Sequence, residues 1–227
     1  MCGRYSFAPS PKQLASPRLR KPEQVKDWKI SFHIAPTHSA LVIANDRPAV
    51  LQPMIWGLVP HWSPDGANSG QNINARSESI LDKPSFREPI RMRRCLVPAD
   101  SFYEWRTEPG RRKVPYRILL DNGDLLFMAG IWDEWGQGPE KKRSFSILTT
   151  TPNREMSAFH DRMPVIFTHL EEQERWLADI PETAVLEMLH PPADGLLRMY
   201  RVSEKLNSPG YDGADLHDPV AEPWVLF

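Results

Sequence analysis

Short apolar stretches recur along this chain at close spacing, and this pattern is typical of β-strands rather than of long helices. The stretches are rich in Val, Ile, Phe and Trp. We expect strands over residues 40–44, 49–59, 95–98, 116–121, 125–132, 144–150 and 163–167. Asn122-Gly123 lies between two of these stretches, and this dipeptide predicts a hairpin turn because both residues tolerate a positive φ.

Helical segments are fewer than the strands. We expect them over residues 77–81, 152–159, 171–178 and 182–189. Pro152 suits a first helical turn, and the sequence from Thr168 to Glu171 has a capping pattern. Strands dominate and no regular alternation of strand and helix is present. The predicted class is therefore α+β, with a mainly antiparallel, barrel-like β-sheet and short peripheral helices.

The length of 227 residues suits a single domain over residues 1–227, and we expect the C-terminal tail from about residue 211 to be peripheral. The two cysteines, Cys2 and Cys95, are far apart, and the chain has no apolar run typical of a signal peptide or membrane span. These features predict a protein of the cytoplasm, near a bacterial nucleoid, or of a eukaryotic nucleus, and not a secreted one. We expect a monomer without a membrane partner.

The net charge is −1, but the two halves of the chain differ strongly. Residues 1–119 carry 19 Lys and Arg against 10 Asp and Glu, whereas residues 120–227 carry 9 against 19. The basic side chains are densest at Arg87, Arg91, Arg93, Arg94, Arg111, Arg112 and Lys113. Such a cluster suits nucleic-acid phosphates, although many charge clusters only face solvent.

Several common site chemistries are absent from the sequence. There is no glycine-rich phosphate loop and no nucleophile elbow of the hydrolase type. The two separated cysteines and seven scattered histidines do not have the spacing of a zinc site. We therefore expect neither a metal ion nor another cofactor.

Cys2 directly follows Met1, so removal of one residue would leave an amine and a thiol on adjacent carbons. An N-terminal pair of this kind condenses with an aldehyde: the amine forms a Schiff base, and the thiol then closes a five-membered thiazolidine. Modest tuning of either group would activate the pair at cellular pH. The alternative is an inert cysteine at a frayed terminus.

Three further polar residues stand among apolar or aromatic neighbours, where an unpaired polar group costs free energy. They are Asn74 before a predicted helix, Glu104 between aromatic residues, and His160 at the end of a predicted helix. Burial among rings favours the neutral carboxyl and suits proton transfer by Glu104. Each also has a structural alternative: a helix cap, an ion-pair partner, and a residue favoured by the helix dipole.

Taken together, these motifs resemble the SOS-response-associated peptidase (SRAP) family, and the similarity runs from residue 2 to about residue 210. The resemblance is carried by Met1-Cys2-Gly3-Arg4, Ala35-Pro36, Trp56-Gly57-Leu58-Val59-Pro60, Asn74-Ala75-Arg76-Ser77-Glu78, Phe102-Tyr103-Glu104-Trp105, His160-Asp161-Arg162-Met163-Pro164, and Val202-Ser203 with Asn207. Seven separated motifs in one order rarely recur by chance.

The resemblance implies a sensor of abasic sites in single-stranded DNA that acts in the DNA damage response. Such a protein forms a thiazolidine crosslink with the ring-opened sugar aldehyde and shields the lesion, with possible lyase and autopeptidase activities. By matching motifs, Cys2 is the nucleophile and Asn74 orients or stabilises the reacting sugar. Glu104 is the general base or acid, and His160 assists ring opening and proton transfer.

The resemblance also implies residues that contact DNA. Arg4, Arg76 and Arg162 would hold the phosphates around the lesion, and Trp62 and Trp105 are candidate walls or stacking surfaces. The expected partner is therefore single-stranded DNA that contains an abasic site. Protein partners are not identified by the sequence.

One position departs from the family pattern. The family usually has asparagine in a Tyr-Asn-x-Ala-Pro motif, whereas this chain has histidine in Phe32-His33-Ile34-Ala35-Pro36. Histidine keeps a hydrogen-bonding group but can ionise near neutral pH. The local DNA contacts and the pH optimum are the properties that this change would affect.

Two other classes of function fit parts of the sequence. An N-terminal-nucleophile peptidase or amidase would use Cys2 with its own amine as base, beginning with its own leader. A non-catalytic nucleic-acid-binding module would use the motifs only to hold the fold. Turnover of an amide would favour the first alternative, and the absence of any covalent DNA adduct would favour the second.

Overall fold

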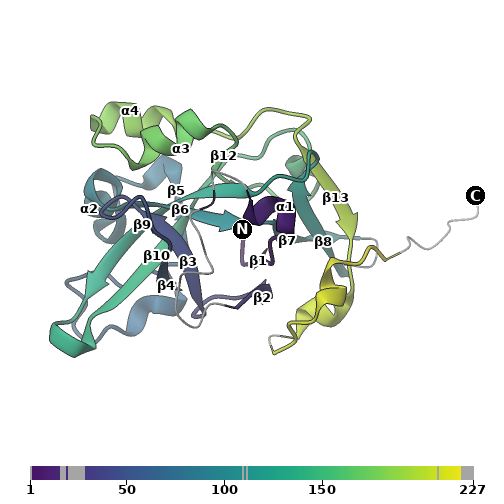
Figure 1. Cartoon of the computed structure of the whole chain (residues 1–227), viewed down its shortest axis with the longest axis horizontal. Helices are drawn as coiled ribbons and strands as arrows, with labels where there is room; N and C mark the ends of the chain where they lie inside the picture. The colour runs from purple at the N-terminus through teal and green to yellow at the C-terminus, as the bar shows by residue number, and fades with distance from the viewer. Residues whose placement is uncertain are drawn as a thin grey trace, which may run out of the picture.

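Five strands close into a barrel that forms one half of the molecule (Figure 1). The computed structural model describes residues 2–15, 19, 29–108, 110, 112–208 and 210–220. The barrel strands are β3 (Ser39–Ala44), β4 (Gln52–Trp56), β6 (Arg94–Ala99), β9 (Leu126–Trp135) and β10 (Lys142–Thr150). The ring closes because β9 pairs with both β6 and β10, while β10 also pairs in parallel with β4.

The other half is an antiparallel sheet of five strands in the order β13-β8-β7-β1-β2. Its strands are β1 (Arg4–Phe7), β2 (Ser31–Ile34), β7 (Ser101–Thr107), β8 (Lys113–Leu120) and β13 (Leu197–Arg201). β1 lies between β7 and β2, so the start of the chain is held by neighbours on both sides. Figure 1 shows this N-terminal segment between the two halves of the molecule.

The chain passes from barrel to sheet at Asp100, between β6 and β7. The Asp100 carboxylate accepts hydrogen bonds from Ser6 Oγ at 2.9 Å, from the Ala8 backbone N–H at 2.6 Å and from Arg117 Nη2 at 2.8 Å. These contacts satisfy a buried charge and attach β1 and β8 to the bend. Asp100 thus fixes the transition between the halves through contacts with the β1 segment and with β8.

The main apolar core fills the barrel and continues into the space beside the sheet. Trp56, at the end of β4, stacks on Phe145 of β10 with ring centroids 6.4 Å apart, and meets Tyr5 of β1 edge-on at 5.1 Å. Gly130 of β9 permits close strand packing, because an added Cβ would lie 2.8 Å from Cys95 Sγ. Cys95 is therefore a buried packing residue of the barrel.

The smaller elements pack around the barrel and the five-stranded sheet or pair with barrel strands. They are α1 (Pro11–Leu14), α2 (Pro84–Met92), α3 (Leu170–Leu177), α4 (Glu182–Glu187), β5 (Asn74–Arg76), β11 (Met163–Pro164), β12 (Ile166–Phe167), and the 3₁₀ turns η2 (Ala67–Gly70), η3 (Ser77–Ser79), η5 (Gly138–Glu140), η6 (Met156–Ala158), η7 (Glu204–Asn207) and η8 (Ala214–His217). No helix in the described part of the chain is long and apolar enough to cross a membrane. The predicted α+β class with a mainly antiparallel, barrel-like sheet is confirmed.

Several local predictions need correction. The Asn122-Gly123 turn forms, with Gly123 at φ +75°, but β8 and β9 do not pair as a hairpin because each joins a different sheet. The helix expected over residues 152–159 is only the turn η6, since Asn153 Oδ1 accepts from the Met156 N–H at 3.1 Å. The helix expected over residues 77–81 is likewise the single turn η3.

The C-terminal segment also packs more closely than the sequence indicates. We expected a peripheral tail from about residue 211, yet Leu216 of η8 is fully buried, and the His217 ring meets the Phe32 ring at 4.8 Å. Leu216 belongs to a second apolar cluster with Tyr103, Val202 and Leu206. Packed residues therefore extend into η8, and residues 221–227 lie outside the described part of the chain.

Arg94 is a buried cation that joins α2 to α3. Its guanidinium donates to the backbone carbonyls of Ile90 and Arg91 in α2, and to those of Trp176 and Ala178 at the end of α3. Carbonyls at a helix C-terminus lack intrahelical partners and favour a positive charge. Arg94 therefore stabilises the fold, and its charge is not available to an external anion.

We predict that Arg94→Ala lowers the free energy of unfolding by about 3 kcal/mol, because four buried carbonyl groups lose a charged donor. Arg94→Lys should recover only part of the loss, since one ammonium cannot reach all four acceptors. Urea denaturation measures the change. Arg87→Ala, an exposed change on α2, is the control and should stay within about 0.5 kcal/mol of the wild type; equal effects of Arg94→Ala and Arg87→Ala would contradict the assignment.

Candidate functional site

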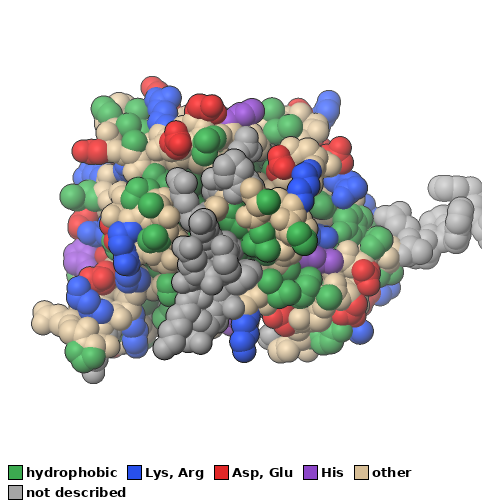
Figure 2. All heavy atoms as spheres, viewed as in Figure 1, with side chains coloured by type: hydrophobic (Ala, Val, Ile, Leu, Met, Phe, Trp, Pro, Cys, Tyr) green, Lys and Arg blue, Asp and Glu red, His purple; other side chains and the backbone are tan. Residues whose placement is uncertain are grey.

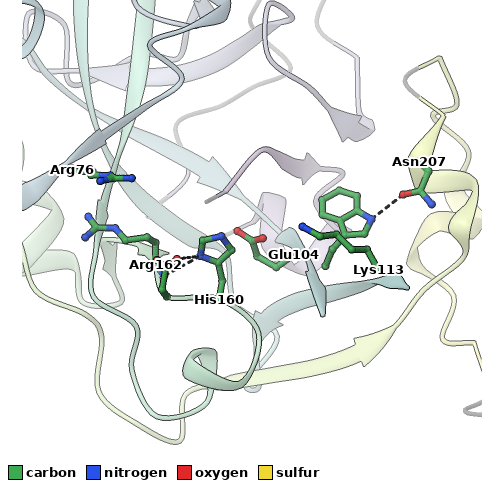
Figure 3. A pocket seen from close by; sticks show the side chains of 8 residues that line it. Arg76, Glu104, Lys113, His160, Arg162 and Asn207 are labelled. Atoms are coloured by element: carbon green, nitrogen blue, oxygen red, sulfur yellow. Dashed lines mark hydrogen bonds and ion pairs between the residues drawn. The ribbon is translucent and has the colours of Figure 1, made fainter. Parts of the chain in front are cut away.

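A pocket of about 700 Å³ opens beside β5 and β7 (Figure 3). It is lined by Arg76, Glu104, Trp105, Lys113, His160, Asp161, Arg162 and Asn207. Five of these residues were predicted for the site from the sequence: Arg76, Glu104, Trp105, His160 and Arg162. The structure therefore brings together side chains from four segments that are far apart in the sequence.

Glu104 and His160 face one another across this pocket, as Figure 3 shows. Glu104 lies in β7 opposite Tyr116 of β8, and it is 4% exposed. His160 Nδ1 lies 3.0 Å from the Arg162 backbone N–H and 2.6 Å from Asp161 Oδ1. The N–H donates to the neutral ring and the carboxylate accepts from the protonated ring. These two contacts hold His160 Nδ1 within its own loop and so fix the orientation of the ring.

Cys2 lies close enough to Glu104 for the carboxylate to act on its thiol, but it does not line the pocket. It is fully buried, and its carbonyl oxygen accepts a hydrogen bond from Asn74 Nδ2 at 2.8 Å. Asn74 belongs to β5, which pairs with β10 of the barrel. Asn74 Oδ1 is also buried and has no hydrogen-bond partner among the described residues. The amide therefore joins the barrel to the chain start and keeps one acceptor for a further donor.

The electrostatic surroundings of Cys2 favour the neutral thiol. Burial raises the pKa of the Cys2 thiol well above its ordinary value, and the nearby Glu104 carboxylate raises it further. A fully formed thiolate is therefore not the resting state of this residue. Among the carboxylates of the described residues, Glu104 is the one whose charge acts on this thiol.

Arg162 is held by the protein itself. Its guanidinium pairs with Glu78, and Nη2 donates to the Thr149 carbonyl at 2.6 Å and to Thr149 Oγ1 at 3.2 Å. The hydrogen bond from Arg162 lowers the pKa of Glu78. Only 11% of the Arg162 side chain is exposed, so much of its donor capacity is already used inside the protein.

Arg76 and Lys113 provide the freer positive charge of the pocket. Arg76 is exposed, and its side chain has no hydrogen-bond or ion-pair partner among the described residues. Lys113 begins β8, and Figure 3 shows its amine directed toward the Glu104 side of the pocket. Arg76 and Lys113 therefore stand on opposite sides of Glu104 and His160. An anionic chain that crosses the pocket would meet a cation on each side of these two residues.

Trp105 forms the wall near Lys113. Its Nε1 donates to Asn207 Oδ1 at 2.8 Å, which attaches this indole to the turn η7 (Figure 3). Trp62, by contrast, lies in the loop after β4, is 51% exposed and does not line the pocket. Of the two predicted tryptophans, only Trp105 is part of the pocket.

Arg4 lies in β1 beside Tyr103 and does not line the pocket either. Its Nε donates to His33 Nε2 at 2.9 Å, and Nη1 donates to the Gly3 carbonyl at 2.7 Å. His33 is the residue that departs from the family pattern. Burial lowers the pKa of His33, so the ring is neutral near neutral pH.

Much of the predicted basic cluster is neutralised inside the protein. Arg91 pairs with Glu182, Arg93 pairs with Glu88 and Asp133, and Arg94 donates to carbonyls as described above. Figure 2 shows acidic and basic side chains interspersed over the visible face. The excess of arginine in the sequence therefore overstates the positive surface of the folded chain.

The residues predicted for the site from the sequence did not include Lys113, Asp161 or Asn207. All three stood in segments that the sequence had singled out, namely a basic cluster, the His160 motif and the motif near Val202. Nothing local in the sequence indicates that they share a pocket. Among the described residues, no three His, Cys, Asp or Glu side chains cluster as metal ligands do.

The chain matches the family model described as SOS response associated peptidase (SRAP) over residues 1–209. It is 38% identical over 197 residues to abasic site processing protein YoaM of Bacillus subtilis, which covers 85% of this chain and 86% of that protein. It is 32% identical over 216 residues to abasic site processing protein HMCES of Mus musculus, which covers 77% of this chain and 60% of that protein.

The fold is also similar to a crystal structure of a protein from Bacteroides thetaiotaomicron. The TM-score is 0.84 at 28% sequence identity, and the match covers 97% of this chain and 100% of that one. The family model covers residues 1–209, and each of these relatives and the solved structure covers more than three quarters of the chain. The chain therefore belongs to the SOS response associated peptidase (SRAP) family.

Proposed function

We propose that this protein processes abasic sites in single-stranded DNA by forming a covalent thiazolidine between Cys2 and the sugar aldehyde, which shields the lesion. The observation that carries the proposal is the position of Cys2. Asn74 holds its carbonyl, and Glu104 acts electrostatically on its thiol. Relatives that are 38% and 32% identical are named abasic site processing proteins.

The first step opens the sugar ring. An abasic site exists mainly as a closed hemiacetal, so the reaction must remove a proton from the C1′ hydroxyl and deliver one to O4′. A facing base and acid can do both, and the opposed Glu104 and His160 suit this division. The retained partners of His160 Nδ1 keep the ring in place during the exchange.

The next steps join the protein to the aldehyde. Removal of Met1 exposes the α-amine of Cys2, which attacks C1′ and loses water to form a Schiff base. The thiol then adds to C1′, and its proton is transferred to the amine nitrogen, so that one water is lost overall. Because the resting thiol is neutral, we infer that the amine attacks first and that Glu104 accepts the thiol proton during ring closure.

The charges of the pocket suit a nucleic-acid strand. Arg76 and Lys113 stand on either side of Glu104 and His160, where they would contact phosphates on both sides of the lesion. Trp105 offers a flat surface for a neighbouring base. A lesion whose neighbours are unpaired enters such a pocket at lower cost, which favours single-stranded DNA.

Two alternatives use parts of the same site. A peptidase or amidase would use the Cys2 thiolate directly, and the raised pKa of this thiol disfavours that route. A binding module would hold DNA at Arg76 and Lys113 without reacting. A denaturation-resistant adduct with DNA that depends on Cys2 would favour the proposal over both alternatives.

We predict that Cys2→Ala abolishes the denaturation-resistant adduct with single-stranded DNA carrying one abasic site, while non-covalent binding persists. The wild type should lack Met1, and the adduct should have the summed mass of protein and DNA less one water. A denaturing gel and intact mass spectrometry measure both. The control is Cys95→Ala, in which the other buried thiol is removed. Active protein that retains Met1, or an adduct that requires Cys95, would contradict the mechanism.

We predict that Glu104→Gln slows crosslinking by about 10²–10⁴-fold, because the amide keeps the shape but cannot accept a proton. The same change removes a charge that raises the pKa of the Cys2 thiol, so this pKa should fall. Single-turnover rates and alkylation of the thiol against pH measure the two effects. Glu108→Gln, which alters a carboxylate paired with Arg106, is the control. A lowered thiol pKa with a normal crosslinking rate would exclude Glu104 as the base.

We predict that Arg76→Ala flattens the salt dependence of DNA affinity by about 0.7 in the slope of log affinity against log salt, the contribution of one phosphate on a single strand. Titrations of labelled DNA at several salt concentrations measure this slope. Arg175→Ala removes the same charge from the exposed face of α3 and should leave the slope unchanged. Equal slopes for all three proteins would show that Arg76 does not contact a phosphate.

A further inference from the structure

His33 lies between Arg4 and the C-terminal segment and is bonded to both. Its Nε2 accepts from Arg4 Nε at 2.9 Å, and its Nδ1 lies 2.8 Å from the Tyr211 carbonyl oxygen. An arginine N–H can only donate and a carbonyl can only accept. The two partners together therefore require the neutral ring with its proton on Nδ1.

The Tyr211 carbonyl is itself held in place. The Tyr211 hydroxyl donates to Asp215 Oδ1 at 2.5 Å, and Lys205 Nζ donates to Asp215 Oδ2 at 2.8 Å. The Lys205 amine also lies 5.1 Å from the centre of the Tyr211 ring. These contacts, together with the buried Leu216, attach the C-terminal segment to the sheet. His33 therefore has a fixed acceptor on one side and Arg4 on the other.

Three charged or titratable groups from different elements face His33. They are Arg4 of β1, Asp212 of the C-terminal segment, and His38 of the turn before β3. His33 is 2% exposed, and burial is the largest cause of its lowered pKa. The hydrogen bond to Tyr211 opposes this shift, and the positive charge of Arg4 adds to it.

Arg4 keeps donor capacity beyond these contacts. Nε is bonded to His33 and Nη1 to the Gly3 carbonyl, whereas Nη2 has no partner among the described residues. A guanidinium whose Nε edge is fixed presents its remaining N–H groups in a defined direction, which lowers the entropy lost on binding an anion.

We propose that His33 is a positioning residue that, as a neutral hydrogen-bond acceptor, orients Arg4 toward a phosphate of the bound DNA and makes DNA affinity sensitive to acid. The inference rests on the proposed function. Protonation of His33 would place an N–H against the Arg4 N–H and a second cation beside it. His33 is too deeply buried to contact the phosphate itself, so its protonation releases Arg4 without replacing it.

The sign of the pH effect follows from the lowered pKa. Above the ordinary histidine value of about 6.5 the ring is neutral whether or not it is bonded to Arg4, and affinity is at its full value. Below that value, states in which the ring has left Arg4 take up the proton more readily, so they gain population. DNA affinity should therefore fall as the pH decreases from 7.5 to 5.5.

Two substitutions distinguish the hydrogen-bond acceptor for Arg4 from the ability of residue 33 to take up a proton. The side-chain amide of glutamine reaches about as far as Nε2, so His33→Gln keeps an acceptor for Arg4 and does not ionise. The amide of asparagine reaches only as far as Nδ1, so His33→Asn keeps a donor for Tyr211 and loses the contact with Arg4. Both variants are neutral and polar at the same buried position.

The test measures binding without reaction. Each His33 variant is made in the Cys2→Ala background and titrated with single-stranded DNA that carries a tetrahydrofuran abasic analogue, at pH 7.5 and 5.5 and constant ionic strength. The Cys2→Ala protein with His33 should lose affinity about five- to tenfold at pH 5.5 relative to His33→Gln. His33→Asn should already show that weaker affinity at pH 7.5. In an Arg4→Ala background, the proteins with His33 and with His33→Gln should no longer differ in DNA affinity at pH 5.5.

Nitrogen-detected NMR of the DNA-free protein provides an independent measurement, since the chemical shifts of the two ring nitrogens report the tautomer. A proton on Nε2 of His33 at pH 7.5 would overturn the inference. The inference would also be overturned if the His33 and His33→Gln proteins both bound DNA and their affinities had the same pH dependence. A failure of every protein to bind DNA at either pH would instead contradict the proposed function, and this inference with it.

Discussion

The hydrogen bond from Asn74 Nδ2 to the Cys2 carbonyl oxygen joins the two halves of the molecule at the site. Asn74 belongs to β5 on the barrel side, and Cys2 precedes β1 inside the five-stranded sheet. A chain start is ordinarily among the least ordered parts of a protein. Here two neighbouring strands and one amide hold it. Because β1 pairs directly with β7, the sheet itself sets the position of Cys2 relative to Glu104. The barrel adds Asn74 to this arrangement, and Asp100 at the junction helps to fix how barrel and sheet meet.

Burial keeps two ionisable groups of this region neutral, in opposite ways. It raises the pKa of the Cys2 thiol, an acid, and lowers the pKa of the His33 imidazole, a base. The more exposed charges, Arg76 and Lys113, stand around the pocket, where water still solvates them. The pocket therefore has accessible positive charge beside a neutral buried thiol, which would suit an anionic ligand. In the proposed mechanism, the neutral thiol favours attack by the amine before attack by the sulfur.

Much of the barrel could be predicted from the sequence, because continuous apolar stretches report burial on both faces of a strand. β3, β6, β9 and β10 fall within or around predicted stretches. The strands of the other sheet were harder to predict. β1, β7 and β13 carry charged residues within short segments, and tertiary pairing decides that these segments are strands. The turn at Gly123 was predicted correctly, but whether two strands pair depends on the sheet that each one enters.

For the site, the sequence by itself determined which polar residues stand in unusual surroundings: Cys2, Asn74, Glu104 and His160 were all visible in it. The tertiary structure alone decided which of these meet and which charges remain accessible. Arg162 pairs with Glu78, 84 residues away, and His33 is bonded to Tyr211, 178 residues away. Charge pairing and desolvation depend on distances in space between such segments. The sequence supplies the chemical groups, whereas the fold determines which of them are paired and which face the pocket.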